Sequence, residues 1–221
     1  MGLFLGHMED ANEHLVKEFY TNVAHIKKGT TLTKVQNLKV KFDGKTINDY
    51  LGFPEEDELL YLEKMALGEV DRPWLVEYLA ITGTTPAWLT VGVKILRRTL
   101  NFEAKGWETF VYSRLDPTTH DNSLPIHRAI LVASIMAGYP INIENVMSRV
   151  ITRVVNEGDR SYAFPNFLTM YLEDLDVEKR KFDMKVKAKA PFSWYNLQGD
   201  DPKGSTSRVK PLLQLASLKS Q

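Results

Sequence analysis

The amino-acid sequence predicts a mainly α-helical protein: a single helical domain over residues 1–177, a small N-terminal β-hairpin within it, and a flexible basic tail over residues 178–221. Three observations predict this organisation. Apolar residues recur at spacings of three and four along most of the chain, strand-like alternation is limited to residues 30–42, and the composition changes after residue 177. With 221 residues, 43% of them hydrophobic, the chain can bury a core.

The N-terminal elements are a helix and the hairpin. Residues 9–26 carry apolar side chains on one helical face. Residues 30–42 alternate around Gln36 and Asn37, which suit a turn, and such a hairpin must pack on helices because a lone one is marginal in water. We expect Asp43 to cap a short helix that Gly52 closes, although Asp43 and Gly44 also suit a second turn.

The middle of the chain is predicted to hold two short helices and an ambiguous stretch. The acidic residues EEDE at 55–58 are expected in the first turn of a helix, where they suit its dipole. Another helix is expected to start near Pro73 and to stop at Gly83. Residues 84–86 form a loop, and residues 88–100 fit either a helix or a strand.

The second half has clearer helix boundaries. Asn101 is expected to cap a helix that ends before Asp116 and Pro117. Ser123 is expected to cap a central, mostly small or apolar helix that Gly138 ends. Asn142 is expected to cap the next helix, and a last helix covers residues 167–175.

No catalytic, metal-binding or cofactor-binding residues are predicted. The chain lacks a P-loop and the GxGxxG, GxSxG and HExxH motifs, and it has no cysteine for disulfides, thiolate zinc sites or a cysteine nucleophile. Most acidic residues fall at helix starts or on exposed faces, whereas two-metal chemistry needs them on a rigid frame. The five histidines lack metal-ligand spacing: His7, His14, His25, His120 and His127.

Three residues allow either a functional or a structural interpretation. Trp107 and Phe110 could stack on nucleic-acid bases, but their helical spacing favours the core. Arg128 on an apolar helix is expected either to be buried and satisfied by loop carbonyls or an acid such as Asp116, or to bind a ligand at the surface.

The formal net charge of zero hides two unlike parts. Residues 1–177 hold 18 basic and 24 acidic residues, whereas residues 178–221 hold 10 basic and 4 acidic residues. The basic run of the tail consists of Lys179, Arg180, Lys181, Lys185, Lys187 and Lys189. This run would bind nucleic acid weakly and without sequence preference, would act as a nuclear import signal, or would simply be solvated. Residues 211–218 would suit a short amphipathic helix.

No apolar run approaches the length of a membrane span, so we expect an intracellular protein, nuclear or cytoplasmic, without a membrane partner.

Several segments, in order over residues 12–177, resemble the family called Putative plant transposon protein domain, which is often labelled transposase. They are LVKEFYTN at 15–22, VKF at 40–42, INDYLGFP at 47–54, AKGW at 104–107 with Phe110, LDPTTH at 115–120, RAIL at 128–131, INI at 141–143 and FP at 164–165. The resemblance implies structural roles for Phe19, Tyr20, Asn48, Trp107, Phe110, Pro117, His120, Arg128, Asn142 and Pro165.

The resemblance implies a plant mobile-element origin, but it brings no catalytic residues. The last helix also departs from the family at Leu168-Thr169, where a cysteine typically follows the leucine. Our first hypothesis is a non-catalytic interaction or assembly module, with a protein partner or self-association and weak nucleic-acid binding by the tail. The alternatives are a metal-dependent DNA transposase or nuclease, and a decayed inactive copy.

Overall fold

In the part of the chain that the structure describes, short helices predominate, with three two-stranded sheets beside them. The computed structural model describes residues 10–24, 31–117, 122–157, 162–178 and 183–187. Its α-helices there are α2 (Glu13–Ala24), α3 (Gly44–Leu51), α4 (Leu59–Leu67), α5 (Arg72–Leu79), α6 (Phe102–Phe110), α7 (Ile126–Ala137), α8 (Ile143–Glu157) and α9 (Pro165–Asp174). The predicted mainly α fold is confirmed.

The predicted N-terminal hairpin is present. Strands β2 (Leu32–Val35) and β3 (Leu38–Lys41) pair antiparallel. Gln36 and Asn37 have φ angles of 47° and 71°, the left-handed pair that a two-residue type I′ turn requires. The side chain of Asp43 then accepts a hydrogen bond from the backbone N–H of Thr46 at 2.8 Å, so Asp43 caps α3 as expected.

Helix α2 starts later than its apolar pattern suggested. Ala11–Asn12 form strand β1, which pairs antiparallel with β6 (Lys185–Val186) from the other end of the chain. The side-chain oxygen of Asn12 accepts hydrogen bonds from the backbone N–H groups of His14 and Leu15, each at 3.1 Å. A side chain that satisfies the first free N–H groups explains why α2 begins at Glu13.

The middle segment differs most from expectation. The acidic residues at 55–58 precede α4 and are not in its first turn. Helix α5 stops at Leu79 and not at Gly83, because Ala80 is extended and forms a β-bridge with Leu100. The ambiguous stretch contains the 3-10 helices η2 (Ala87–Leu89) and η3 (Arg97–Thr99) around strand β4 (Ile95–Leu96).

The start of α7 is a second correction. Ser123 does not cap this helix, because Ser123–Leu124 form strand β5, which pairs antiparallel with β4. Pro125 occupies the N-cap position without a side-chain cap bond, and its fixed φ angle suits a helix start. Gly138 ends α7 in the left-handed conformation, as predicted.

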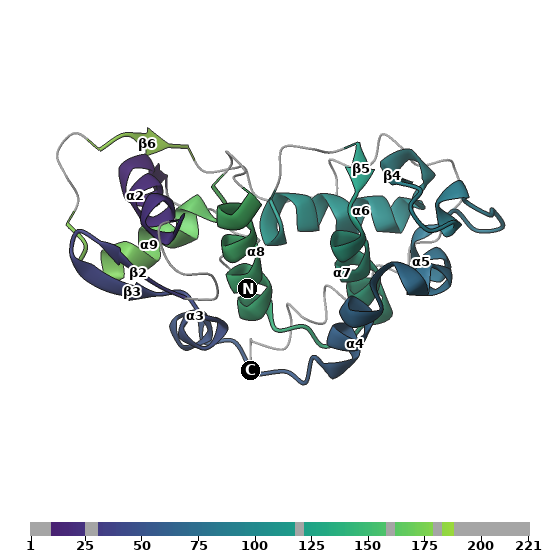
Figure 1. The fold of residues 1–221 in the computed structure, drawn as a ribbon, viewed down its shortest axis with the longest axis horizontal. Coiled ribbons are helices and arrows are strands. Elements are labelled where there is room, and N and C mark those ends of the chain that lie inside the picture. Colours follow the sequence, from purple (N-terminus) through teal and green to yellow (C-terminus); the bar gives the residue numbers. More distant parts are fainter. Residues whose placement is uncertain (1–9, 25–30, 118–121, 158–161, 179–182, 188–221) are drawn as a thin grey trace, which may run out of the picture.

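The elements gather at two ends joined by α8. Figure 1 shows α2, α3, α9 and the β2–β3 hairpin at one end, α4 to α7 at the other, and α8 between them. Helix α7 contacts α4, α5 and α6, and every residue from Arg128 to Ser134 is buried, so α7 is central as expected. Over the described residues, each helix is too short or too polar to cross a lipid bilayer.

Candidate functional site

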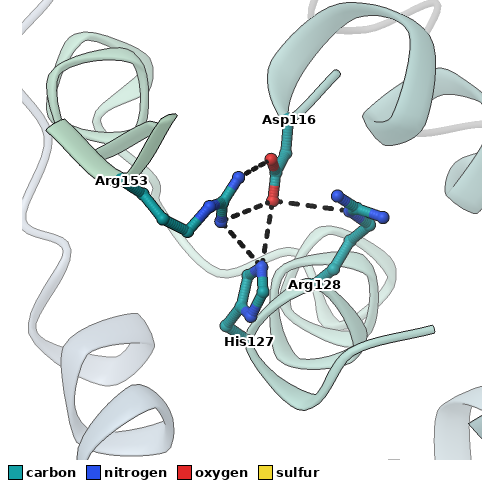
Figure 2. Close-up of polar contacts among 4 residues, drawn as sticks. All are labelled: Asp116, His127, Arg128 and Arg153. Atoms are coloured by element: carbon teal, nitrogen blue, oxygen red, sulfur yellow. Dashed lines mark hydrogen bonds and ion pairs between the residues drawn. The ribbon is translucent and has the colours of Figure 1, made fainter. Parts of the chain in front are cut away.

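Three elements meet around the buried carboxylate of Asp116. Asp116 directly follows η4 (Val111–Leu115), a π-helical continuation of α6. His127 and Arg128 come from the first turn of α7, and Arg153 comes from α8; Figure 2 shows all three side chains directed at the carboxylate. We call these four residues the Asp116 cluster.

The carboxylate accepts hydrogen bonds from Arg153 and Arg128, and the ring of His127 lies beside it. Arg153 donates through Nη1 to Oδ2 at 3.1 Å and through Nη2 to Oδ1, the forked geometry that suits a guanidinium and a carboxylate. Nε of Arg128 lies 3.4 Å from Oδ2, and Nε2 of His127 lies 3.2 Å from the same oxygen. Of the two expectations for Arg128, the structure shows the buried one, paired with Asp116.

The cluster keeps Asp116 ionised. Burial by itself raises the pKa of this carboxyl, but hydrogen bonds from His127 and Arg153 and the charge of Arg128 outweigh it. The net result is a pKa well below the ordinary value for aspartate. A deprotonated carboxylate whose two oxygens are both occupied is a poor proton acceptor and instead holds η4, α7 and α8 together.

His127 faces both a donor and an acceptor through one nitrogen. Its Nε2 lies 2.7 Å from Nη1 of Arg153 and 3.2 Å from Oδ2 of Asp116. A neutral ring with its proton on Nδ1 accepts from Arg153, whereas a proton on Nε2 is donated to Asp116. Among the described residues, no group of three or more histidine, cysteine, aspartate or glutamate side chains could hold a metal ion.

A second polar cluster attaches the N-terminal end of α4 to α8. The side chain of Asn142 accepts from the backbone N–H of Glu56 at 2.8 Å and donates to its carbonyl at 2.9 Å. The buried Glu58 accepts from the backbone N–H of Asn142 at 3.2 Å and from Nδ2 of Asn145 at 2.8 Å. Nothing in the sequence distinguished Glu58 from its exposed acidic neighbours.

The outward side of α4 is apolar and exposed. We call Leu59, Leu60, Leu62, Leu67 and Val70 the α4 surface; these side chains are 57%, 48%, 40%, 47% and 78% exposed. The first four share the side of the helix opposite the buried Tyr61, and Val70 follows in the 3-10 helix η1 (Gly68–Asp71).

The two charged residues of α4 point in different directions. Nζ of Lys64 lies 2.5 Å from Oδ2 of Asp71 and 4.5 Å from the ring centre of Trp74, so its charge is held against the body of the protein. Glu63 is exposed on the same side as the leucines. The α4 surface is therefore apolar, with acidic charge and without an available cation on its own helix.

A neighbouring loop lies beside η1. The backbone N–H of Gly92 donates to Glu69 in η1 at 3.1 Å, and Nη1 of Arg72 donates to the carbonyl of Val93 at 2.8 Å. Val91 and Val93 are 64% and 39% exposed. These bonds hold the loop beside η1, in the half of the molecule that contains α4 to α7 in Figure 1.

A family model described as Putative plant retrotransposon-related domain matches residues 1–178. The chain belongs to this family. The expected resemblance is confirmed, and so is an origin in a plant mobile element. Neither a curated protein nor a solved structure matches the chain.

In this retrotransposon-related domain, most family-motif residues support the fold. Phe19 and Tyr20 lie in the core, and the hydroxyl of Tyr20 donates to the carbonyl of Ala163 at 2.9 Å. Trp107 and Phe110 are buried with their rings edge to face, which leaves no flat face for a base. Asn48 and Pro117 are half-buried, Pro165 starts α9, and His120 lies outside the described residues.

The tail of the domain is only partly described. Lys179, Arg180, Lys181, Lys189 and residues 211–218 lie outside the described residues, while Lys185 and Lys187 are exposed. Pairing of β6 with β1 is reinforced by Nδ2 of Asn12, which donates to Asp183 at 2.7 Å. The tail thus returns to the start of α2 before it continues.

Proposed function

We propose that this plant retrotransposon-related domain is a non-catalytic interaction module that binds a protein partner through the α4 surface. The observation that carries the proposal is a helix with four leucines exposed on one side. Scattered apolar residues are normal on a protein surface, but a contiguous group on one helix face is typical of a binding site. Helix-in-groove and helix-on-helix recognition use such faces.

Helix α4 is held against the body of the protein at both ends, which favours binding. Glu58 fixes the start of α4 to α8, and the ion pair of Lys64 with Asp71 fixes its end. A partner therefore pays little to order the helix. Burying the remaining exposed half of one leucine yields about 1 kcal/mol, so the five side chains supply about 4–5 kcal/mol. That amount supports weak binding and needs additional contacts for tight binding.

Photo-crosslinking tests this proposal in the full chain. A photoreactive amino acid in place of Leu60 should give a discrete adduct in plant extract. Mass spectrometry then identifies the crosslinked partner, and the purified partner should form the same adduct. The same group in place of Lys45, which is exposed on α3, serves as the matched control. Leu59→Ser with Leu62→Ser should abolish the adduct. Equal adducts from both positions, or none from Leu60, would contradict the proposal.

We further propose that the tail adds weak, sequence-blind nucleic-acid binding. Its support is the ten basic residues among 178–221 and the exposure of Lys185 and Lys187. Changing the six basic residues of the run to glutamine should weaken duplex DNA binding and reduce the slope of log affinity against log salt by about 5. A control exchanges exposed body lysines, Lys34, Lys39 and Lys45. Unchanged binding at low salt by the tail variant would refute this role.

A further inference from the structure

We propose that residues 208–219 of the same chain bind the α4 surface, so that an external partner must displace them. The inference rests on the proposed function, because it assigns a regulatory occupant to the same surface. Two observations support this inference: the exposed side chains that define the α4 surface, and the opposite charges of residues 55–71 and residues 202–221.

The α4 surface lies in a strongly acidic stretch. Residues 55–71 contain seven acidic residues and one lysine, and that lysine is engaged by Asp71. Glu55, Glu56 and Asp57 are exposed just before α4, and Glu63 is exposed among the leucines. A fitting occupant is therefore an apolar helix with basic residues on its flanks.

The C-terminal segment has that composition. Residues 202–221 contain four basic residues and no acidic residue. Four leucines lie between Pro211 and Leu218, with Arg208 and Lys210 before them and Lys219 after them. Proline suits the first position of a helix, and Gln214 and Ser217 would share its polar side. The leucines of this segment would cover the leucines of α4, while its basic flanks would lie near the acidic residues around α4.

A second copy of the α4 surface fits less well. Two such surfaces would bring two acidic rims together, and like charges across an interface are costly. The C-terminal segment carries basic charge where a second α4 surface would carry acidic charge, and it offers leucines for the same apolar contact. Charge complementarity thus selects this segment over α4 of another copy.

The connecting chain is long enough. The last described residues, at 183–187, include β6, whose pairing with β1 gives the tether a fixed origin. The 23 residues from 188 to 210 span up to about 75 Å when extended. A compact domain of this size has a radius of gyration of about 16 Å. Tethering also raises the effective concentration of the segment, so the modest apolar contact of the α4 surface is sufficient.

Paramagnetic relaxation in the full chain tests the inference directly. The chain has no cysteine, so Ser217→Cys provides a single attachment point for a nitroxide. The label should broaden the amide signals of residues 59–67 at least twofold, relative to the reduced label, and should spare those of β2 and β3. The matched control carries the same label with Leu212→Asp and Leu215→Asp, which should restore the α4 signals. Broadening that misses α4 would overturn the inference.

A mixing experiment separates the same chain from a second copy. Isotope-labelled chain without the nitroxide is mixed with unlabelled chain that carries it. We expect no broadening at α4 in this mixture; broadening there equal to that in the single chain would overturn the same-chain occupant.

The crosslinker at position 60 separates this inference from the proposed function. Leu212→Asp with Leu215→Asp should raise the yield of the partner adduct, by about tenfold if the segment covers α4 nine-tenths of the time. A partner adduct whose yield ignores these changes would refute only the covering segment. Loss of every adduct from position 60 would refute the proposed function itself.

Discussion

Replacing Asp116 with asparagine removes the carboxylate that joins η4, α7 and α8. The variant keeps the size of the side chain but leaves the guanidinium of Arg128, whose side chain is only 4% exposed, without its ionised partner. Breaking one partner of a buried ion pair typically costs 3–5 kcal/mol. Since Arg153 and His127 are 25% and 35% exposed and can turn toward water, we expect a loss near 2–4 kcal/mol.

The pH dependence of that loss follows from the lowered pKa of Asp116. A group whose pKa is lower in the folded than in the unfolded chain stabilises the fold above its unfolded pKa, and this stabilisation fades as the pH falls toward the folded pKa. The unfolded value is about 3.9. The difference between the wild-type chain and Asp116→Asn should therefore be constant from about pH 5 to pH 8 and shrink below about pH 4.

Urea unfolding followed by tryptophan fluorescence and circular dichroism measures both effects. Asp49→Asn is the matched control, because its partner Lys45 and Asp49 itself are 85% and 65% exposed; it should change the free energy of unfolding by less than about 0.5 kcal/mol. Arg128→Met added to Asp116→Asn should recover part of the loss, because it removes the unpaired buried charge. A loss for Asp116→Asn no larger than that of the control would refute this account of the cluster.

Two further substitutions test how α3 and α4 are held on α8. In Gly44→Ala the new Cβ would overlap Oδ1 of Asn145 on α8, so we expect the free energy of unfolding in urea to fall by about 1–3 kcal/mol. Asn145→Ala should relieve part of this loss, and an unchanged free energy of unfolding would contradict close packing of α3 on α8. Glu58→Gln turns one acceptor into a donor that faces the N–H groups of Asn142 or Asn145. We therefore expect the free energy of unfolding to fall by about 1–2 kcal/mol and the amides of α4 to exchange hydrogen faster. Unchanged exchange in α4 would contradict this anchoring role.

Much of the local structure followed from residues close together in the chain. The turn at Gln36 and Asn37, the cap at Asp43 and the end of α7 at Gly138 each depend on one residue's backbone preference or on a bond to a near neighbour. The prediction for Ser123 was wrong because pairing of β5 with β4 outweighed the capping tendency of serine. The end of α5 was misplaced because Ala80 is extended in a bridge to Leu100.

The candidate sites divide in the same way. Sequence alone left two possibilities for Arg128: burial with loop carbonyls or an acid such as Asp116 as its partner, or ligand binding at the surface. The partner that the structure shows, Asp116, is only 12 positions away. Arg153, which lies 37 positions from Asp116, had no such signal and entered the cluster only through the placement of α8. The sequence likewise showed that α4 is rich in leucine, but whether those leucines are covered depends on distant segments. Tertiary packing decided that Tyr61 faces the core and that Leu59, Leu60, Leu62 and Leu67 do not, because a helix buries only the side that meets its neighbours.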